Sequence, residues 1–203
     1  MTRGSALTDS VIDRLMQGLR ILPGVGPRTA QRMAFYLLQR NTDGARELHR
    51  LLGDALEAAR LCARCRMLCE TELCSVCASD RRDAEVLCVV QSPTDQWNIE
   101  QLQQYSGRYF VLHGCLSPME RIGPDEIGVP LLRALLERSP PSEVILALSY
   151  TLEGETTASY LQELLSDSGA TVSRLSRGVP QGGELEYVDR QTLAQALRER
   201  RAL

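Results

Sequence analysis

The chain has 203 residues, of which 43% are hydrophobic and 24% charged, and this composition is typical of a folded protein rather than a disordered one. No apolar run approaches the roughly 20 residues that a membrane-spanning helix needs, and charges interrupt residues 1–20, so we expect no membrane span or signal peptide and predict a cytoplasmic protein. The net charge of −3 hides an asymmetry, because residues 1–82 hold 13 arginines against 9 acidic residues, whereas residues 83–203 hold 10 against 17.

The N-terminal part predicts three helices. Apolar residues recur at helical spacing across residues 8–20, where Thr8 or Asp9 is available as an N-cap. A second helix begins at a proline, which suits a first turn, and spans about residues 27–39. The third pattern covers residues 48–59 and leads directly into the first cysteine of a cluster, without a linker.

The C-terminal part alternates short apolar runs with helical patterns. The predicted strands are residues 86–90, 109–112, 144–148 and 171–175, and the predicted helices between them are residues 94–104, 129–138 and 156–168. Continuous apolar strands that alternate with helices indicate a parallel sheet covered on both faces. Residues 178–183 have the composition of a loop, and residues 190–201 predict a charged terminal helix.

Four of the seven cysteines form two closely spaced Cys-x-x-Cys pairs. These are Cys62, Cys65, Cys74 and Cys77. In a reducing compartment this pattern favours metal binding, and two such pairs complete the tetrahedral thiolate set of a structural zinc site. The alternative is a group of unrelated thiols, and Cys69 between the pairs is a possible fifth ligand that breaks the pattern. Cys88 and Cys115 fall in or beside predicted strands and are expected in the core.

A glycine hairpin joins the first two predicted helices, because residues 22–26 read Leu-Pro-Gly-Val-Gly. Gly24 and Gly26 can adopt backbone angles that other residues disfavour, and the amides at the start of the next helix form a phosphate site. Arg28 and Arg32 are four residues apart and share the helix face beside it. We predict that these four residues bind the DNA backbone without reading sequence; the alternative is an ordinary tight turn with solvated arginines.

Two polar loops follow the carboxyl ends of predicted strands, where ligands bind in open α/β sheets. The residues of interest in them are Gln91, Asp95, Ser149, Thr151, Glu153 and Glu155.

The chain resembles the RecR family of bacterial recombination mediators along nearly its whole length. The resemblance is carried by the hairpin, by the cysteine cluster followed by Arg-Arg-Asp at residues 81–83, and by residues 106–112, 123–128, 151–156 and 178–189. It implies an α+β multidomain fold with a helix-hairpin-helix domain at 1–61, a four-cysteine zinc-finger module at 62–83, a Toprim-type α/β domain with a parallel sheet at 84–176, and a C-terminal arm and helix at 177–203.

The resemblance also identifies the positions at which catalytic Toprim enzymes hold Mg²⁺ with carboxylates. Gln91 stands at the position of the glutamate, although RecR proteins usually retain a glutamate there. Ser149 and Thr151 stand at the positions of the two aspartates. A neutral amide and two hydroxyls are poor ligands for a hard cation, so no catalytic residue is expected. Asp95 matches the family pattern, and Glu153 and Glu155 lie nearby.

The function implied by the resemblance is non-enzymatic. It is a recombinational DNA repair factor that acts with RecO, and with RecF, to help load the recombinase RecA on single-stranded DNA covered by single-strand-binding protein. The family implies a homo-oligomer, either a ring-shaped tetrameric clamp or a dimer, which binds single- and double-stranded DNA independently of sequence. One alternative is a Mg²⁺-dependent nuclease or primase-like enzyme of the same fold, and another is a zinc-dependent protein scaffold without DNA affinity.

Overall fold

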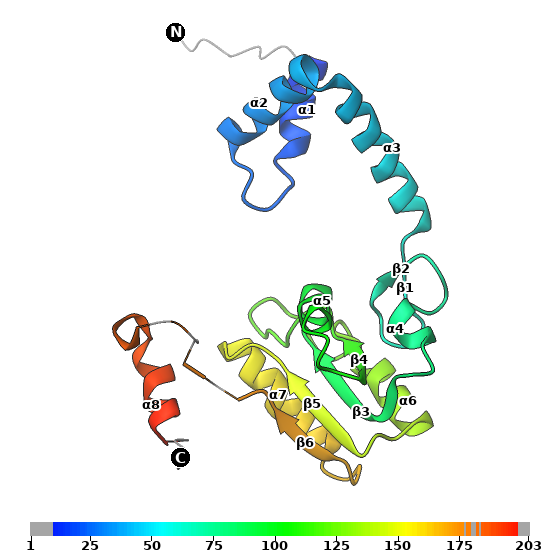
Figure 1. The fold of residues 1–203 in the computed structure, drawn as a ribbon, viewed down its shortest axis with the longest axis vertical. Helices are drawn as coiled ribbons and strands as arrows, with labels where there is room; N and C mark the ends of the chain where they lie inside the picture. The colour runs from blue at the N-terminus through cyan, green and yellow to red at the C-terminus, as the bar shows by residue number, and fades with distance from the viewer. Residues whose placement is uncertain (1–9, 177, 180–181, 183, 199–203) are drawn as a thin grey trace. The chain divides into compact units, whose positions relative to one another are not determined.

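The computed structural model describes residues 10–176, 178–179, 182 and 184–198. The chain divides into two compact units, Met1–Ala59 and Arg60–Leu203. Figure 1 labels the elements of each unit. Among the described residues, no helix is both long and apolar enough to cross a membrane.

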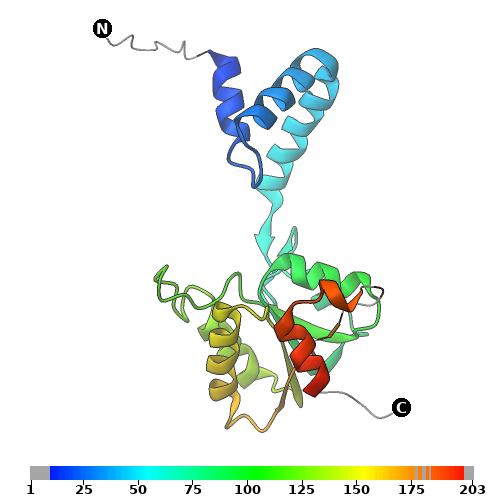
Figure 2. The ribbon, with the colours of Figure 1, turned by 90° about the vertical axis from the view of Figure 1, so that its left-hand side faces the viewer.

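The N-terminal unit is helical, as predicted. Its elements are α1 (Val11–Leu19), α2 (Pro27–Phe35), a π-helical turn η1 (Tyr36–Arg40) and α3 (Thr42–Ala58). α1 and α2 lie side by side and are joined by the hairpin (Figure 2). The N-cap of α1 is Ser10, whose hydroxyl accepts a hydrogen bond from the Asp13 amide at 3.1 Å, so the expectation of Thr8 or Asp9 at this position was wrong. Thr8 and Asp9 themselves lie outside the described residues.

This unit has a sparse core. Among its described residues only Ala30 and Ala34 are fully buried apolar side chains, and both lie on α2. The apolar side chains of α3 face solvent instead, with exposed fractions of 54% for Leu48, 58% for Leu52 and 74% for Leu56. The apolar stripe of an amphipathic helix is normally buried against another element, because each leucine left in solvent loses about 1.5–3 kcal/mol of burial free energy.

The C-terminal unit begins with the cysteine module. A short antiparallel hairpin pairs β1 (Arg60–Leu61) with β2 (Leu68–Cys69), and the helix α4 (Ser75–Ala78) follows. The third helix of the chain therefore does not run directly into Cys62, because Ala59 adopts extended backbone and β1 intervenes.

A four-stranded parallel sheet follows, in the order β4-β3-β5-β6. The strands are β3 (Asp83–Val90), β4 (Gly107–Val111), β5 (Glu143–Ala147) and β6 (Thr171–Arg174), and the helices are α5 (Pro93–Gln101), α6 (Val129–Arg138) and α7 (Leu152–Leu165). α7 begins before the predicted residue 156, because the Thr151 hydroxyl caps it by accepting from the Gly154 amide at 3.2 Å.

The two faces of the sheet pack against different partners. Alternate strand residues point to opposite faces, and the side chains of Leu87, Phe110 and Leu146 pack with residues of α6 and α7. The other face carries Val90 and Val111, which pack with the four clustered cysteines and with the partly buried Ile99 of α5. The predicted covering of both faces is thus correct, but one cover is largely the cysteine module rather than a helix.

The C-terminal segment contains a 3-10 turn η2 (Leu185–Tyr187), which was not predicted, and the helix α8 (Arg190–Arg198). α8 confirms the predicted terminal helix as far as Arg198, and residues 199–201 of that prediction lie outside the described residues. The predicted loop at 178–183 is described only at residues 178, 179 and 182.

Candidate metal centre and nucleic-acid interface

The four paired cysteines converge on one point. The sulfur atoms of Cys62, Cys65, Cys74 and Cys77 all lie within 4.8 Å of one another, and all four residues are buried. Tetrahedral zinc with Zn–S bonds of about 2.3 Å separates its sulfurs by about 3.8 Å, so this cluster has the size of a zinc site. Within the described part of the chain, it is the only group of three or more His, Cys, Asp or Glu residues placed to hold a metal.

The backbone around the cluster stabilises negative charge on sulfur. The amide of Met67 donates to Cys65 Sγ at 3.5 Å, and the amide of Cys74 donates to Cys62 Sγ at 3.3 Å. The amide of Cys77 donates to Cys74 Sγ at 3.5 Å. Zinc binds cysteine as thiolate, and amide donors around the ligands favour that form. The donor set and its surroundings therefore fit a structural zinc ion.

The thiols also interact with one another. Cys65 Sγ lies 3.5 Å from Cys74 Sγ, and this hydrogen bond lowers the pKa of the Cys74 thiol while it raises the pKa of Cys65. Cys69 lies apart from the cluster and donates its thiol hydrogen bond to the Thr71 carbonyl at 3.0 Å. The structure thus excludes Cys69 from the group of ligand atoms, and Cys88 and Cys115 are buried in the core as expected.

The loop between Cys65 and β2 attaches the module to the sheet. The Val111 amide of β4 donates to the Cys65 carbonyl at 2.9 Å, and His113 Nε2 donates to the Arg66 carbonyl at 2.7 Å. The Arg66 guanidinium donates to the carbonyls of Ile127 at 2.6 Å and Leu112 at 3.2 Å. Nothing in the spacing of the cysteines signals this role of Arg66, because its partners are 46 and 61 residues away in sequence.

Gly128 explains part of the motif at residues 123–128. It caps α6 with a left-handed φ of 79°, and a Cβ placed on it would overlap the Arg66 guanidinium. Glycine is therefore required here both by its backbone conformation and by the close approach of Arg66.

A second arginine anchors the segment that follows the module. The Arg82 guanidinium forms a bidentate ion pair with Glu100 of α5, and the Tyr109 hydroxyl donates to the same carboxylate at 2.7 Å. Burial raises the pKa of Glu100, but the hydrogen bonds from Arg82 and Tyr109 outweigh it and lower that pKa overall. This partly buried pair ties the chain after Cys77 to α5 and β4.

The hairpin has the geometry of a type II turn. The Val25 amide donates to the Leu22 carbonyl at 3.1 Å, with Pro23 at the second position and Gly24 at the third with φ of 77°. Gly26, however, has an ordinary extended φ of −83°, so of the two glycines only Gly24 uses a backbone angle that other residues disfavour. A Cβ on Gly26 would meet nothing within 4 Å, so its surface is open to a ligand.

The start of α2 offers an anion site. No side chain caps this helix, and Pro27 lacks an amide hydrogen, so the amides of Arg28 and Thr29 open the helix. Arg28 and Arg32 are both exposed and lie on the face of α2 opposite the buried Ala30 and Ala34. Neither arginine pairs with a carboxylate among the described residues. The geometry brings the four predicted DNA-binding residues to one end and one face of the hairpin.

The predicted residues at the carboxyl edge of the sheet are only partly brought together. Ser149 Oγ donates to Gln91 Oε1 at 2.9 Å and lies 3.1 Å from Thr151 Oγ1, so these three polar groups form one hydrogen-bonded set. Gly154 lets α7 lie close to the Ser149 backbone, because a Cβ on residue 154 would overlap the Ser149 carbonyl. An amide and hydroxyls that are paired with one another hold the two loops together without a cation.

Two of the three neighbouring carboxylates are engaged elsewhere. Asp95 accepts from the Ser92 amide at 2.9 Å and from its hydroxyl at 2.7 Å, which forms a capping box at the start of α5. Glu155 forms an ion pair with Arg174 at 2.8 Å. Glu153 is exposed. Burial raises the pKa of the Cys115 thiol, a hydrogen bond with Thr157 lowers it, and the negative charges of Glu153 and Asp95 raise it further.

Comparison with known proteins gives matches along the chain. The RecR helix-hairpin-helix family model matches residues 12–56, the RecR four-cysteine zinc finger model residues 59–79, the Toprim domain model residues 85–176, and the RecR C-terminal model residues 178–201. The chain is 51% identical over 197 residues to the Recombination protein RecR of Hahella chejuensis, with 97% of this chain and 98% of that protein covered. These matches confirm the predicted helix-hairpin-helix, four-cysteine zinc and Toprim modules, and they identify zinc as the metal.

Substitution of one clustered cysteine tests the metal centre. We predict that Cys74→Ser releases zinc and lowers the thermal unfolding midpoint by about 10 °C or more, because structural zinc binding contributes directly to folding free energy. Cys69→Ser is the matched control, since Cys69 lies in the same module but outside the cluster. Zinc content by elemental analysis and unfolding by circular dichroism measure both effects. Equal zinc content and stability in the two variants would contradict the assignment.

Proposed function

Because the chain belongs to the RecR family of recombination proteins, we propose that it is a non-enzymatic, DNA-binding mediator of recombinational repair. In this proposal it acts with RecO, and with RecF, to help load RecA on single-stranded DNA. The observation that carries the DNA-binding part is the exposed anion site at the start of α2, flanked by Arg28 and Arg32. A cytoplasmic location belongs to the same proposal, because clustered thiolates persist in reducing surroundings.

The absence of an enzymatic step is supported by the residues at the Toprim edge. The amide and hydroxyl groups of Gln91, Ser149 and Thr151 bond to one another, and Asp95 and Glu155 are held by Ser92 and Arg174. A Mg²⁺-dependent nuclease or primase-like enzyme needs carboxylates free to bridge a cation and a phosphate. Among the described residues, no three His, Cys, Asp or Glu side chains at this edge are placed to hold one cation, which argues against the rival activity.

Self-association is the second part of the proposal, and it is supported by the exposed leucine stripe of α3. Leu48, Leu51, Leu52 and Leu56 are each at least 50% exposed, in a unit that buries few apolar side chains of its own. A second copy that presents the same stripe would form a two-fold interface and cover all of them. We propose that this contact is one interface of a dimer or of a ring-shaped tetrameric clamp around DNA.

The DNA contact is tested by the salt dependence of binding. Arg28→Ala/Arg32→Ala should weaken binding of a fluorescent oligothymidylate and reduce the slope of log affinity against log salt by about 1.4, because each lost phosphate contact on a single strand removes about 0.7. The control is Arg46→Ala/Arg50→Ala, which removes the same charge at the same spacing from arginines that pair with acidic neighbours.

Three results would redirect the DNA-binding proposal. Equal slopes for the two double variants would show that Arg28 and Arg32 are not phosphate contacts. Absence of measurable DNA binding by the parent protein would support a protein scaffold without DNA affinity. Cleavage or synthesis of DNA in Mg²⁺ or Mn²⁺ that disappears in Asp95→Asn would support the enzyme.

Charge placed on the leucine stripe tests self-association. Leu52→Glu/Leu56→Glu should reduce the solution mass, because two carboxylates would have to be desolvated at the interface. The control is Gly53→Glu, which introduces the same residue on the same helix where a Cβ meets nothing within 4 Å. Light scattering after size-exclusion chromatography measures the mass. A leucine variant that keeps the mass of the parent protein would remove α3 from the interface.

A further inference from the structure

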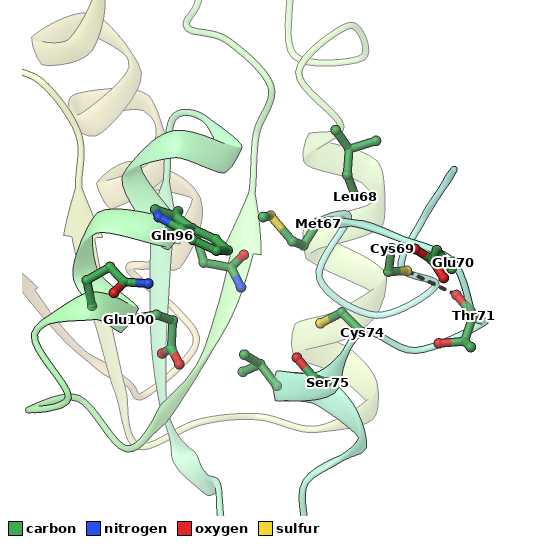
Figure 3. A pocket seen from close by; sticks show the side chains of 12 residues that line it. Met67, Leu68, Cys69, Glu70, Thr71, Cys74, Ser75, Gln96 and Glu100 are labelled. Atoms are coloured by element: carbon green, nitrogen blue, oxygen red, sulfur yellow. Dashed lines mark hydrogen bonds between the residues drawn. The ribbon is translucent and has the colours of Figure 1, made fainter. Parts of the chain in front are cut away.

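A groove of about 520 Å³ lies in the C-terminal unit between the cysteine module and α5, and none of the functions above uses it. Figure 3 shows the side chains that line it, and Gln96 and Met67 face one another across it. One wall is formed by residues 67–71 and 74–76 and the other by Gln96, Trp97, Glu100 and Gln101. The zinc ligand Cys74 is part of the first wall.

Two large apolar side chains border this groove without being covered. Trp97, the single tryptophan of the chain, is 59% exposed, and Leu68 is 55% exposed. Their positions on opposite walls would enclose an apolar side chain inserted between them. Aromatic and aliphatic surfaces of this kind are the usual anchors of protein contacts.

The groove also contains a polar group that lacks a partner. Gln96 is 2% exposed, and its Oε1 atom is buried with no hydrogen-bond partner in the protein. A buried carbonyl oxygen left without a donor costs about 1–3 kcal/mol. An occupant would reach this oxygen only after the Gln96 side chain turns toward the groove, and an N–H group on the occupant would then recover that free energy.

The charge of the lining distinguishes between classes of occupant. None of the twelve lining side chains is basic, and Glu70 at the rim is exposed. Glu70 has no basic partner among the described residues, whereas Glu100 is held by Arg82. Four thiolates around a divalent zinc ion add further negative charge on the side of Cys74. A phosphate backbone would be repelled here, and a basic peptide would be attracted.

We propose that this groove is a docking site for a protein segment that carries an apolar side chain next to an arginine or lysine. The apolar side chain lies between Leu68 and Trp97, and the basic group lies against Glu70. A backbone or side-chain N–H of the segment donates to Gln96 Oε1 once the Gln96 side chain turns toward the groove. The site is separate from the hairpin that is proposed to bind DNA, and it needs neither the DNA contact nor the self-association to be correct.

The zinc-loaded full-length protein can be tested with random peptides displayed on phage, followed by titration of the synthetic form of the enriched peptide. Trp97 reports on the groove directly, because the intrinsic tryptophan fluorescence of the chain arises from this residue alone. We expect enrichment of peptides with an apolar residue close to arginine or lysine. The enriched peptide should change Trp97 fluorescence and bind at least about tenfold more weakly to Glu70→Arg, because charge reversal replaces attraction with repulsion.

Glu72→Arg is the matched control, since Glu72 is exposed in the same module and does not line the groove. It should bind the peptide like the parent protein, with the same zinc content as Glu70→Arg. Gln96→Leu should weaken binding of the peptide, because leucine cannot accept the hydrogen bond. It should maintain or raise the thermal unfolding midpoint, because it removes an unpaired buried carbonyl. A merely structural role of Gln96 would instead lower the midpoint.

Several results would overturn this proposal. The first is that no enriched peptide distinguishes Glu70→Arg from Glu72→Arg. The second is that an oligothymidylate changes Trp97 fluorescence and binds Glu70→Arg more tightly, which would make the groove a nucleic-acid site. The third is a change in solution mass on Glu70→Arg alone, which would make the occupant a second copy of the chain.

Discussion

The hydrogen bond from the Val111 amide to the Cys65 carbonyl, 2.9 Å long, joins the cysteine module to the sheet. β4 is an edge strand, and an open edge exposes amides that can pair with other chains. The loop that carries Cys65 covers this part of the edge, while the sulfur atoms pack against Val90, Tyr109 and Val111 on the face. The metal module is therefore part of the packing of the α/β domain and not an appendage to it.

This arrangement explains why the function is expected away from the metal. All four ligand positions are taken by buried cysteines, so zinc has no open position for a water or a substrate. At the carboxyl edge, Gln91, Ser149 and Thr151 bond to one another, Asp95 caps α5 and Glu155 pairs with Arg174. The proposed contacts with DNA and with a protein segment therefore lie elsewhere, at the exposed hairpin and in the groove beside α5.

The sequence predicted the structure correctly where cysteines or apolar residues recur at short spacing. The paired cysteines predicted the metal centre, and continuous apolar runs predicted the four parallel strands. It was insufficient where a contact joins distant segments: Arg66 binds carbonyls 46 and 61 residues away, and Arg82 meets Glu100 across 18 residues. The hairpin β1–β2 was missed because two-residue strands are too short to show a period of two. The lack of a hydrogen-bond partner for the Gln96 carbonyl depends on how the surrounding residues pack, and the sequence does not indicate it.

If the zinc module holds the edge of the sheet, amide hydrogen exchange at Val111 depends on the metal. We expect this amide to be protected in the zinc-loaded protein and to exchange much faster after a chelator removes the metal, because its acceptor is the Cys65 carbonyl. The amide of Val89, in the central strand β3, should lose less protection. Unchanged protection of Val111 in metal-free protein that remains folded would show that the zinc module does not hold this edge.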